Sequence, residues 1–207
     1  MEETAYGNRG DTFRDGSAVY PKLVVKVRWD GVEETREGFL EKFFNKPPDE
    51  YDLDLSAILC DSAGRAVDVV YYASASYGNG IIEHLGDNRY GHTDGEAWGG
   101  EEMSLDLGRI PPGVQMIDLI INMHNAVTHE QHFPQLKNAY AQLISVYKGS
   151  SKELLRRNLS EKKYIRKNSM VFCRLLREGE SWKYEERFET FDDVDGGDLQ
   201  AIVDKYQ

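Results

Sequence analysis

The chain has 207 residues, of which 40% are hydrophobic and 29% charged, so it can build a packed core and is not disordered. Its formal net charge of −11 at pH 7 disfavours nucleic acid and anionic membranes as partners and favours cations. Two cysteines, Cys60 and Cys173, are too few for a disulfide framework, and each lies in an apolar run typical of a buried thiol. Because no signal-peptide pattern and no apolar stretch of membrane-spanning length is found, we expect a protein of the reducing cytoplasm.

Alternating hydrophobic and polar residues recur along the chain and predict β-strands. In the first stretch, Leu23, Val25 and Val27 alternate with Val24, Lys26 and Arg28, which is typical of a half-buried strand. The expected strands cover residues 23–29, 51–60, 66–73, 81–85, 102–107, 114–124, 139–147, 153–159, 170–176 and 182–191. About ten short strands separated by turn signals favour an all-β fold, a two-sheet β-sandwich. We expect one domain over residues 18–207, preceded by a loose arm over residues 1–17.

Two segments depart from the strand pattern and predict helices. Apolar residues within 36–46 recur at helical spacing until Pro47 ends the pattern. This short inserted helix is expected to cap the sandwich core, with a partner-binding face as the alternative. Near the C-terminus, Asp198 is a candidate N-cap, and the apolar residues that follow it have the i, i+3, i+4, i+7 spacing of an amphipathic helix.

The segment 86–102 links two expected strands and is both acidic and rich in glycine. It holds five acidic side chains against one arginine, together with five glycines. Such a loop repels itself and is costly to order, so an ordered form needs a compensating interaction. A hard divalent cation would supply it, because carboxylates, amides and backbone carbonyls are the ligands of Ca²⁺. The alternative is a solvated loop without a metal.

A second acidic pair lies in the expected strand 51–60. Residues two apart on a strand share a face, so Asp52 and Asp54 point to one side while Leu53 and Leu55 point to the other. Two carboxylates about 7 Å apart repel each other unless they are solvated or bridged by a cation. The pair therefore marks either the wet face of an outer strand or part of a metal site.

Three histidines, His124, His129 and His132, lie close together in the sequence. A helical segment 125–133 would allow a zinc site, but the spacing and the lack of a cysteine favour solvated loop histidines. The sequence shows no Gly-x-Ser-x-Gly motif and no phosphate-binding glycine loop leading into a helix. We therefore expect a protein that is not an enzyme.

Three motifs follow one another along the chain at residues 51–59, 83–88 and 100–107. They read Tyr-Asp-Leu-Asp-Leu-Ser-Ala-Ile-Leu, Glu-His-Leu-Gly-Asp-Asn and Gly-Glu-Glu-Met-Ser-Leu-Asp-Leu. In this order they resemble the TerD-like tellurium-resistance and stress-protein family. Further similar segments lie at residues 26–30, 133–140, 159–161, 171–175, 181–184 and 196–199, so the resemblance covers roughly residues 18–207.

The resemblance implies a β-sandwich that binds calcium ions through acidic loops at one end. It implies a non-catalytic role in stress responses, with other proteins of a stress or resistance complex as partners. The ligands that it implies are Asp30, Asp52, Asp54, Asp87, Asn88, Asp94, Glu101 and Glu102.

Two features of this chain depart from the family pattern. Glu101-Glu102 follow Gly100 where the family usually has Gly-Asp-Asp-Glu, and Trp98 interrupts the acidic run, so we expect a calcium cage of different shape. Residues 31–50 lengthen a link that is typically short in the family. Trp98 at a loop tip also allows an alternative function, calcium-dependent docking onto a membrane or glycan, and a metal-dependent hydrolase is a weaker alternative.

Overall fold

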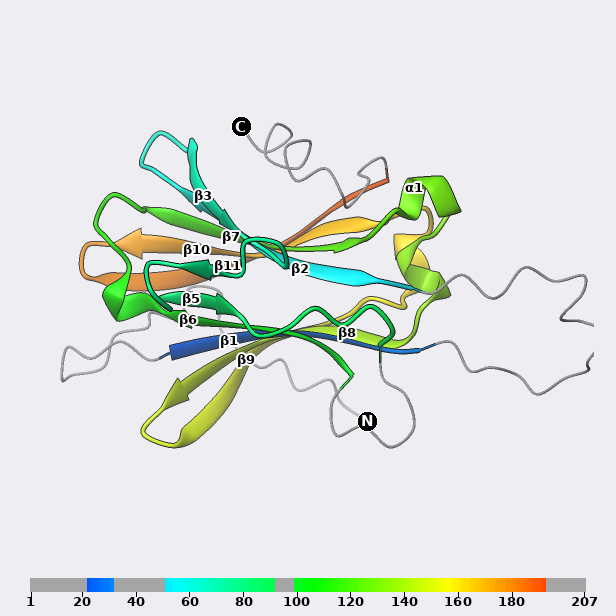
Figure 1. Cartoon of the computed structure of the whole chain (residues 1–207), viewed down its shortest axis with the longest axis horizontal. Helices are drawn as coiled ribbons and strands as arrows, with labels where there is room; N and C mark the ends of the chain where they lie inside the picture. Colours follow the sequence, from blue (N-terminus) through cyan, green and yellow to red (C-terminus); the bar gives the residue numbers. More distant parts are fainter. Residues whose placement is uncertain (1–21, 32–50, 92–98, 193–207) are drawn as a thin grey trace, which may run out of the picture.

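The structure is a computed structural model and describes residues 22–31, 51–91 and 99–192. Figure 1 shows two antiparallel sheets packed face to face, as predicted from the sequence. The expected arm over 1–17, the helix within 36–46 and the C-terminal helix lie outside the described residues. No helix in the described part of the chain is long and apolar enough to cross a membrane.

The described residues form eleven strands in two sheets. The strands are β1 (Lys22–Asp30), β2 (Leu53–Cys60), β3 (Ala66–Val70), β4 (Ser76–Tyr77), β5 (Ile82–His84), β6 (Gly100–Asp106), β7 (Met116–Met123), β8 (Lys137–Tyr147), β9 (Ser150–Asn158), β10 (Ser169–Glu178) and β11 (Ser181–Phe191). The six-stranded sheet has the order β4-β5-β6-β1-β8-β9, and the five-stranded sheet has the order β11-β10-β7-β2-β3. Every expected strand is present, and the short strand β4 is the one that the sequence pattern did not predict.

The core lies between the two sheets and follows the alternation of the strands. In β1, Leu23, Val25 and Val27 have no exposed surface, whereas the residues between them are partly exposed. The side chains of β2 and β7 that point into the core, including Leu55 and Ile121, are equally buried. Because period-2 alternation places every second side chain on one face, each strand contributes a row of apolar side chains to this core.

Strands β2 and β7 are buried on both faces. The outer face of β2 carries Asp54, Ser56 and Ile58, all at most 3% exposed. Ile58 and Cys60 pack there with Ile120 and Val171 in a second apolar cluster, separate from the main core. The prediction of a solvated outer face for this strand is therefore wrong, because polar and apolar side chains are both shielded from water there. Both cysteines are free and buried, as expected.

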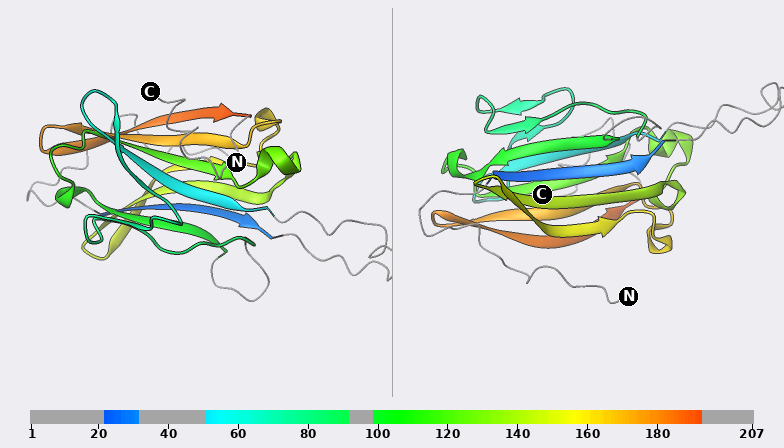
Figure 2. Two further views of the ribbon diagram at one scale, coloured as in Figure 1. Left: turned by 45° about the horizontal axis from the view of Figure 1, so that its top comes forward. Right: turned by 90° about the horizontal axis from the view of Figure 1, so that it is seen from below.

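The connection from β3 to β5 passes from one sheet to the other and leaves one edge open. Strand β3 pairs with β2 only from Ala57 to Cys60, so it does not accompany the first half of β2. The chain then forms a Tyr71–Ser74 bridge and enters the six-stranded sheet through β4 and β5. Figure 2 shows this crossing from two further sides. Among the described residues, the first half of β2 therefore has no strand neighbour in its own sheet on the side that faces β5 and β6.

The segment after β7 is more ordered than the loop that the sequence suggested. It contains the short helix α1 (Ala126–His129) and a 3-10 helix, Phe133–Gln135. Among the described residues, neither His129 nor His132 belongs to a group of three potential metal ligands. The zinc arrangement considered for 125–133 is therefore not formed there.

Candidate metal centre

Four polar side chains form a square on the outer face of the five-stranded sheet, where β2 runs beside β7. Asp54 is directly opposite Asn122 in the antiparallel ladder. The His124 N–H donates to the Asp52 carbonyl oxygen at 2.8 Å, which extends the ladder by one more pair. Because residues two apart on a strand share a face, Asp52, Asp54, Asn122 and His124 all point to the same side. We call these four residues the outer square.

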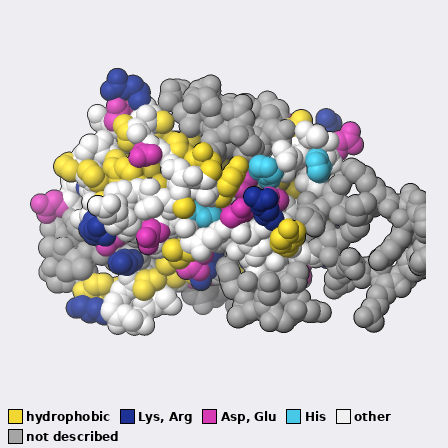
Figure 3. Space-filling view, in the orientation of Figure 1, with side chains coloured by type: hydrophobic (Ala, Val, Ile, Leu, Met, Phe, Trp, Pro, Cys, Tyr) yellow, Lys and Arg dark blue, Asp and Glu magenta, His cyan; other side chains and the backbone are white. Residues whose placement is uncertain are grey.

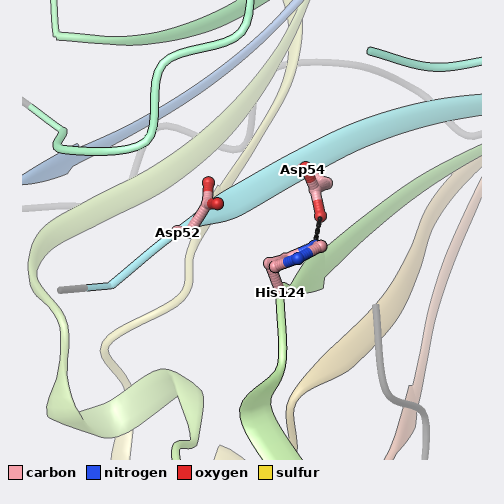
Figure 4. Close-up of side chains that lie close together, drawn as sticks. All are labelled: Asp52, Asp54 and His124. Carbon is pink, nitrogen blue, oxygen red and sulfur yellow. Dashed lines mark ion pairs between the residues drawn. The ribbon is translucent and has the colours of Figure 1, made fainter. Parts of the chain in front are cut away.

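The contacts within the outer square are short and centre on Asp54. Its Oδ2 atom accepts a hydrogen bond from Asn122 Nδ2 at 3.1 Å and lies 3.3 Å from His124 Nδ1. One ligand atom from each of Asp52, Asp54 and His124 lies within 4.8 Å of the others. Figure 4 shows Asp52 just before β2 and Asp54 on it, with the His124 ring next to the Asp54 carboxylate. Two carboxylates and an imidazole thus converge on one point.

A second carboxylate group approaches β2 from the six-stranded sheet. Glu101 Oε2 accepts a hydrogen bond from the Leu55 N–H at 2.7 Å and lies 3.1 Å from His84 Nε2. Since β3 is absent at this point of β2, the Glu101 side chain takes the place of a strand neighbour for that N–H group. Glu101 has no exposed surface, and its Oε1 atom has no hydrogen-bond partner among the described residues.

Burial and crowding of negative charge perturb these carboxyl groups. Burial, followed by the nearby charges of Asp52 and Glu101, raises the pKa of Asp54 to about 8, although the Asn122 hydrogen bond opposes the change. Burial also raises the pKa of Glu101, and the hydrogen bond from His84 opposes it. The charge of Asp87 adds to the rise in pKa at both groups. A cation placed among these carboxylates would offset both the cost of burying their charges and the repulsion between them.

Asp87 and Asn88 lie on the exposed rim of this site. Asp87 Oδ2 is 3.2 Å from Arg89 Nε, in an exposed ion pair. Asn88 Oδ1 accepts hydrogen bonds from the N–H groups of Tyr90 and Gly91 at 2.9 and 3.0 Å, so it shapes the turn. The side-chain oxygen of Asn88 is therefore already hydrogen-bonded to backbone N–H groups in this conformation.

The structure separates the remaining candidate ligands from the site. Glu102 follows Glu101 on β6 and so points to the opposite face, where it lies 2.5 Å from Lys26 Nζ. Asp30, at the end of β1, accepts a hydrogen bond from Asn138 Nδ2. Asp94 lies outside the described residues. Of the eight predicted ligands, the structure thus brings together Asp52, Asp54 and Glu101, with Asp87 and Asn88 at their rim.

Three residues of the site were not among the predicted ligands: His84, Asn122 and His124. The alternation of the strand 114–124 places Asn122 and His124 on one face, but only the strand order shows that β2 is beside them. The position of His84 next to Glu101 follows from the pairing of β5 with β6, which the sequence does not show. The missing information was the identity of each strand's neighbour.

The donor set of the site fits a divalent cation. Asp54 and Glu101 are deeply buried, and two fully buried oxygens, Glu101 Oε1 and Asn122 Oδ1, have no hydrogen-bond partner among the described residues. Buried polar atoms of this kind are costly unless something satisfies them. Carboxylate and amide oxygens are ligands of hard cations. The residues therefore form a possible metal-binding acidic site.

The fold is an antiparallel β-sandwich. The site is an acidic cluster beside the first half of β2, where β3 does not pair with it. The family model described as the TerD domain matches residues 12–206, so the chain belongs to the TerD family. The chain is 30% identical over 177 residues to "Tellurium resistance protein TerX" of Serratia marcescens, covering 78% of this chain and 80% of that protein. It is 25% identical over 194 residues to "Stress response protein SCP2" of Bacillus subtilis, covering 92% of both.

The solved structures agree with the fold. A crystal structure of a homologue of telluride resistance protein (TerD) from Streptomyces coelicolor aligns with a TM-score of 0.67 at 19% identity. The alignment covers 88% of this chain and 95% of the other. At this identity the likeness concerns the β-sandwich alone. The chain is thus a member of the TerD family, with relatives named for tellurium resistance and stress response, and has a two-sheet β-sandwich fold.

Proposed function

We propose that the protein is a calcium-binding stress-response protein that acts in the cytoplasm through protein interaction and not through catalysis. The observation that carries the proposal is the buried acidic cluster, in which the pKa of Asp54 rises to about 8 and Glu101 Oε1 has no partner among the described residues. Relatives named for tellurium resistance and stress response support the biological role.

The oxygens available at the site suit calcium. Ca²⁺ takes six to eight oxygen ligands and tolerates irregular geometry, so carboxylates from separate strands can serve it together with carbonyls and water. The residues that would hold the ion are Asp52, Asp54, Asp87 and Glu101. Bound calcium would join β2 of one sheet to β6 and the segment after β5 in the other sheet. It would thereby order the rim, which we propose as the surface that binds a partner protein.

Thermal unfolding with calcium and with chelator tests the proposal. A ligand that binds only the folded state stabilises it by about 2.7 kcal/mol at a hundredfold excess over its Kd. We expect a higher Tm in millimolar calcium than in EGTA for the wild type. An unchanged Tm across that range would contradict calcium binding.

Two neighbouring glutamates provide a matched pair of variants. Glu101→Gln removes a buried charge at the site but keeps an oxygen that can accept from the Leu55 N–H. Glu102→Gln removes the same charge on the opposite face, beside Lys26. We expect the calcium-dependent Tm shift to be lost in the first variant and kept in the second. Equal effects of the two variants would argue against a role for Glu101.

Calcium-dependent docking onto a membrane or glycan is a second candidate, which exposed apolar side chains at the rim favour. Leu85 and Tyr90 are 54% and 58% exposed and flank Asp87 and Asn88 in sequence. In Figure 3, carboxylate, histidine and arginine side chains gather on the same face beside hydrophobic ones. Sedimentation with phosphatidylserine vesicles in calcium, and binding to immobilised glycans, would detect docking. If the wild-type protein in calcium binds neither the vesicles nor the glycans, this docking function is excluded.

A further inference from the structure

We propose that the outer square also binds a first-row transition-metal ion such as Zn²⁺, with the His124 imidazole as a direct ligand. This inference deepens the proposed function and rests on it, because both ions would use Asp52 and Asp54. The site would therefore respond to two classes of cation, and the nitrogen ligand would distinguish them.

The ligand types of the outer square argue for this second ion class. Calcium is bound through oxygen, so an imidazole contributes nothing to a calcium cage. Imidazole suits zinc, copper, iron and nickel, and carboxylates can complete their coordination. The three ligand atoms from Asp52, Asp54 and His124 lie within 4.8 Å of one another. Ligands of a tetrahedral zinc ion lie about 3–4 Å apart, given zinc–ligand distances of about 2.0–2.2 Å. Small side-chain rotations would close that difference.

The structure holds the His124 ring in position for such a role. Its backbone N–H donates to the Asp52 carbonyl at 2.8 Å, and its ring meets Tyr72 edge-on with the centroids 6.1 Å apart. The Nδ1 atom is buried and faces Asp54 Oδ2 at 3.3 Å. This contact lacks hydrogen-bond geometry, and Nδ1 has no hydrogen-bond partner among the described residues. Nδ1 is thus the ring atom placed to meet a cation that Asp54 also binds.

Asn122 gives an independent indication of a ligand beside the carboxylates. Its side chain has no exposed surface, and Nδ2 holds Asp54 Oδ2 at 3.1 Å. This is the kind of hydrogen bond that orients a ligating carboxylate in metal sites. The Asn122 Oδ1 atom has no partner among the described residues, so the same side chain offers an oxygen that needs one.

The test uses the full chain without a histidine tag, after treatment with chelator. ZnCl2 and CaCl2 are titrated separately by calorimetry into the wild type, His124→Phe and His129→Phe. Phenylalanine keeps a ring at position 124 and removes both nitrogens. His129, on α1, is an exposed histidine five residues away and serves as the matched control. We expect His124→Phe to weaken zinc binding by at least about tenfold, since loss of even an outer contact costs 10–100-fold. Calcium affinity should stay within about twofold, and His129→Phe should match the wild type.

A second measurement needs no variant. Zinc added to the ¹⁵N-labelled wild type should move the Nδ1 resonance of His124, whereas calcium should leave it in the position of a non-ligating nitrogen.

The outcomes separate this inference from the proposed function. Equal zinc affinity in wild type and His124→Phe, or an unmoved Nδ1 resonance with zinc, overturns the transition-metal inference and leaves calcium binding standing. Parallel loss of zinc and calcium affinity in His124→Phe also overturns it, because the substitution then acts on the site as a whole. Zinc binding that depends on His124, in a protein that binds no calcium, supports the imidazole ligand and overturns the calcium proposal alone.

Discussion

Asp54→Asn should stabilise the protein without metal and abolish its response to calcium. Asp54 has a side chain that is only 5% exposed, and its pKa is about 8 in the fold against an ordinary value of 3.8. At pH 7 the unfolded chain holds this carboxylate ionised, whereas the folded chain must either retain a proton or bury the charge. The raised pKa therefore lowers the unfolding free energy at pH 7 by an upper limit of about 4 kcal/mol, at 1.36 kcal/mol for each pKa unit.

Asparagine removes that cost and keeps the shape of the side chain. Its Oδ1 atom can still accept the hydrogen bond from Asn122. For a chain of this size, 1 kcal/mol shifts Tm by roughly 2–4 °C, so the upper limit corresponds to a rise of roughly 8–16 °C in EDTA. Differential scanning calorimetry at pH 7 would measure this rise. At pH 5 the gain should be smaller, because folded Asp54 is then protonated and the unfolded carboxyl has started to gain protons.

Asp118→Asn, on the neighbouring strand β7, is the matched control on the same outer face of the five-stranded sheet. Asp118 is as buried as Asp54, but it forms a paired contact with Arg174, with N–O distances of 2.7 and 2.8 Å. Removing it leaves the arginine charge without its partner, which should cost about 3–5 kcal/mol. The two substitutions should therefore change Tm in opposite directions. A fall in Tm for Asp54→Asn in EDTA would refute the argument from crowded carboxylates.

Three further predictions concern pH, backbone and core. The unfolding free energy of the wild type in EDTA should fall from pH 5 to pH 8, by at most about 1.4 kcal/mol per pH unit, because Asp54 keeps a proton that the unfolded chain releases. Tm should fall with it, and the calcium-induced rise in Tm should grow over the same interval. Gly91→Ala should lower the unfolding free energy by at least about 1 kcal/mol in urea titrations, because φ is +69° and a Cβ would lie 2.5 Å from Trp29 Nε1. Gly179→Ala, at φ +62° with open space, should lose less and leave Trp29 fluorescence unchanged. Phe172→Ala should cost about 3–5 kcal/mol in the same titration through the cavity that it leaves.

The strands were predictable because their signal is local. Alternation along 23–29 is confirmed by β1, whose apolar residues face the core. The same alternation across Glu101, Met103 and Leu105 agrees with the inward position of Glu101 and the outward position of Glu102. Strand β4 has only two residues, too few to show a period.

The composition of the site was predictable in part. The shared face of Asp52 and Asp54 follows from their spacing, and both belong to the possible metal-binding group. His124 was interpreted as a solvated loop histidine because nothing in the sequence indicates that it continues the ladder between β2 and β7. Asp54 and Asn122 are 68 residues apart, and their contact depends on the order of strands in the sheet.

The sequence by itself determined the period of the strands, the density of acidic residues and the family resemblance, because all three are properties of neighbouring residues. Only the tertiary structure decided that β3 does not pair with the first half of β2, and that the Leu55 N–H receives Glu101 instead. It also decided that the outer face at Asp54 is buried and that His124 stands beside it. The physical reason is that the charge state of a carboxyl group depends on its burial and on charges within a few ångströms, and residues distant in the sequence supply both.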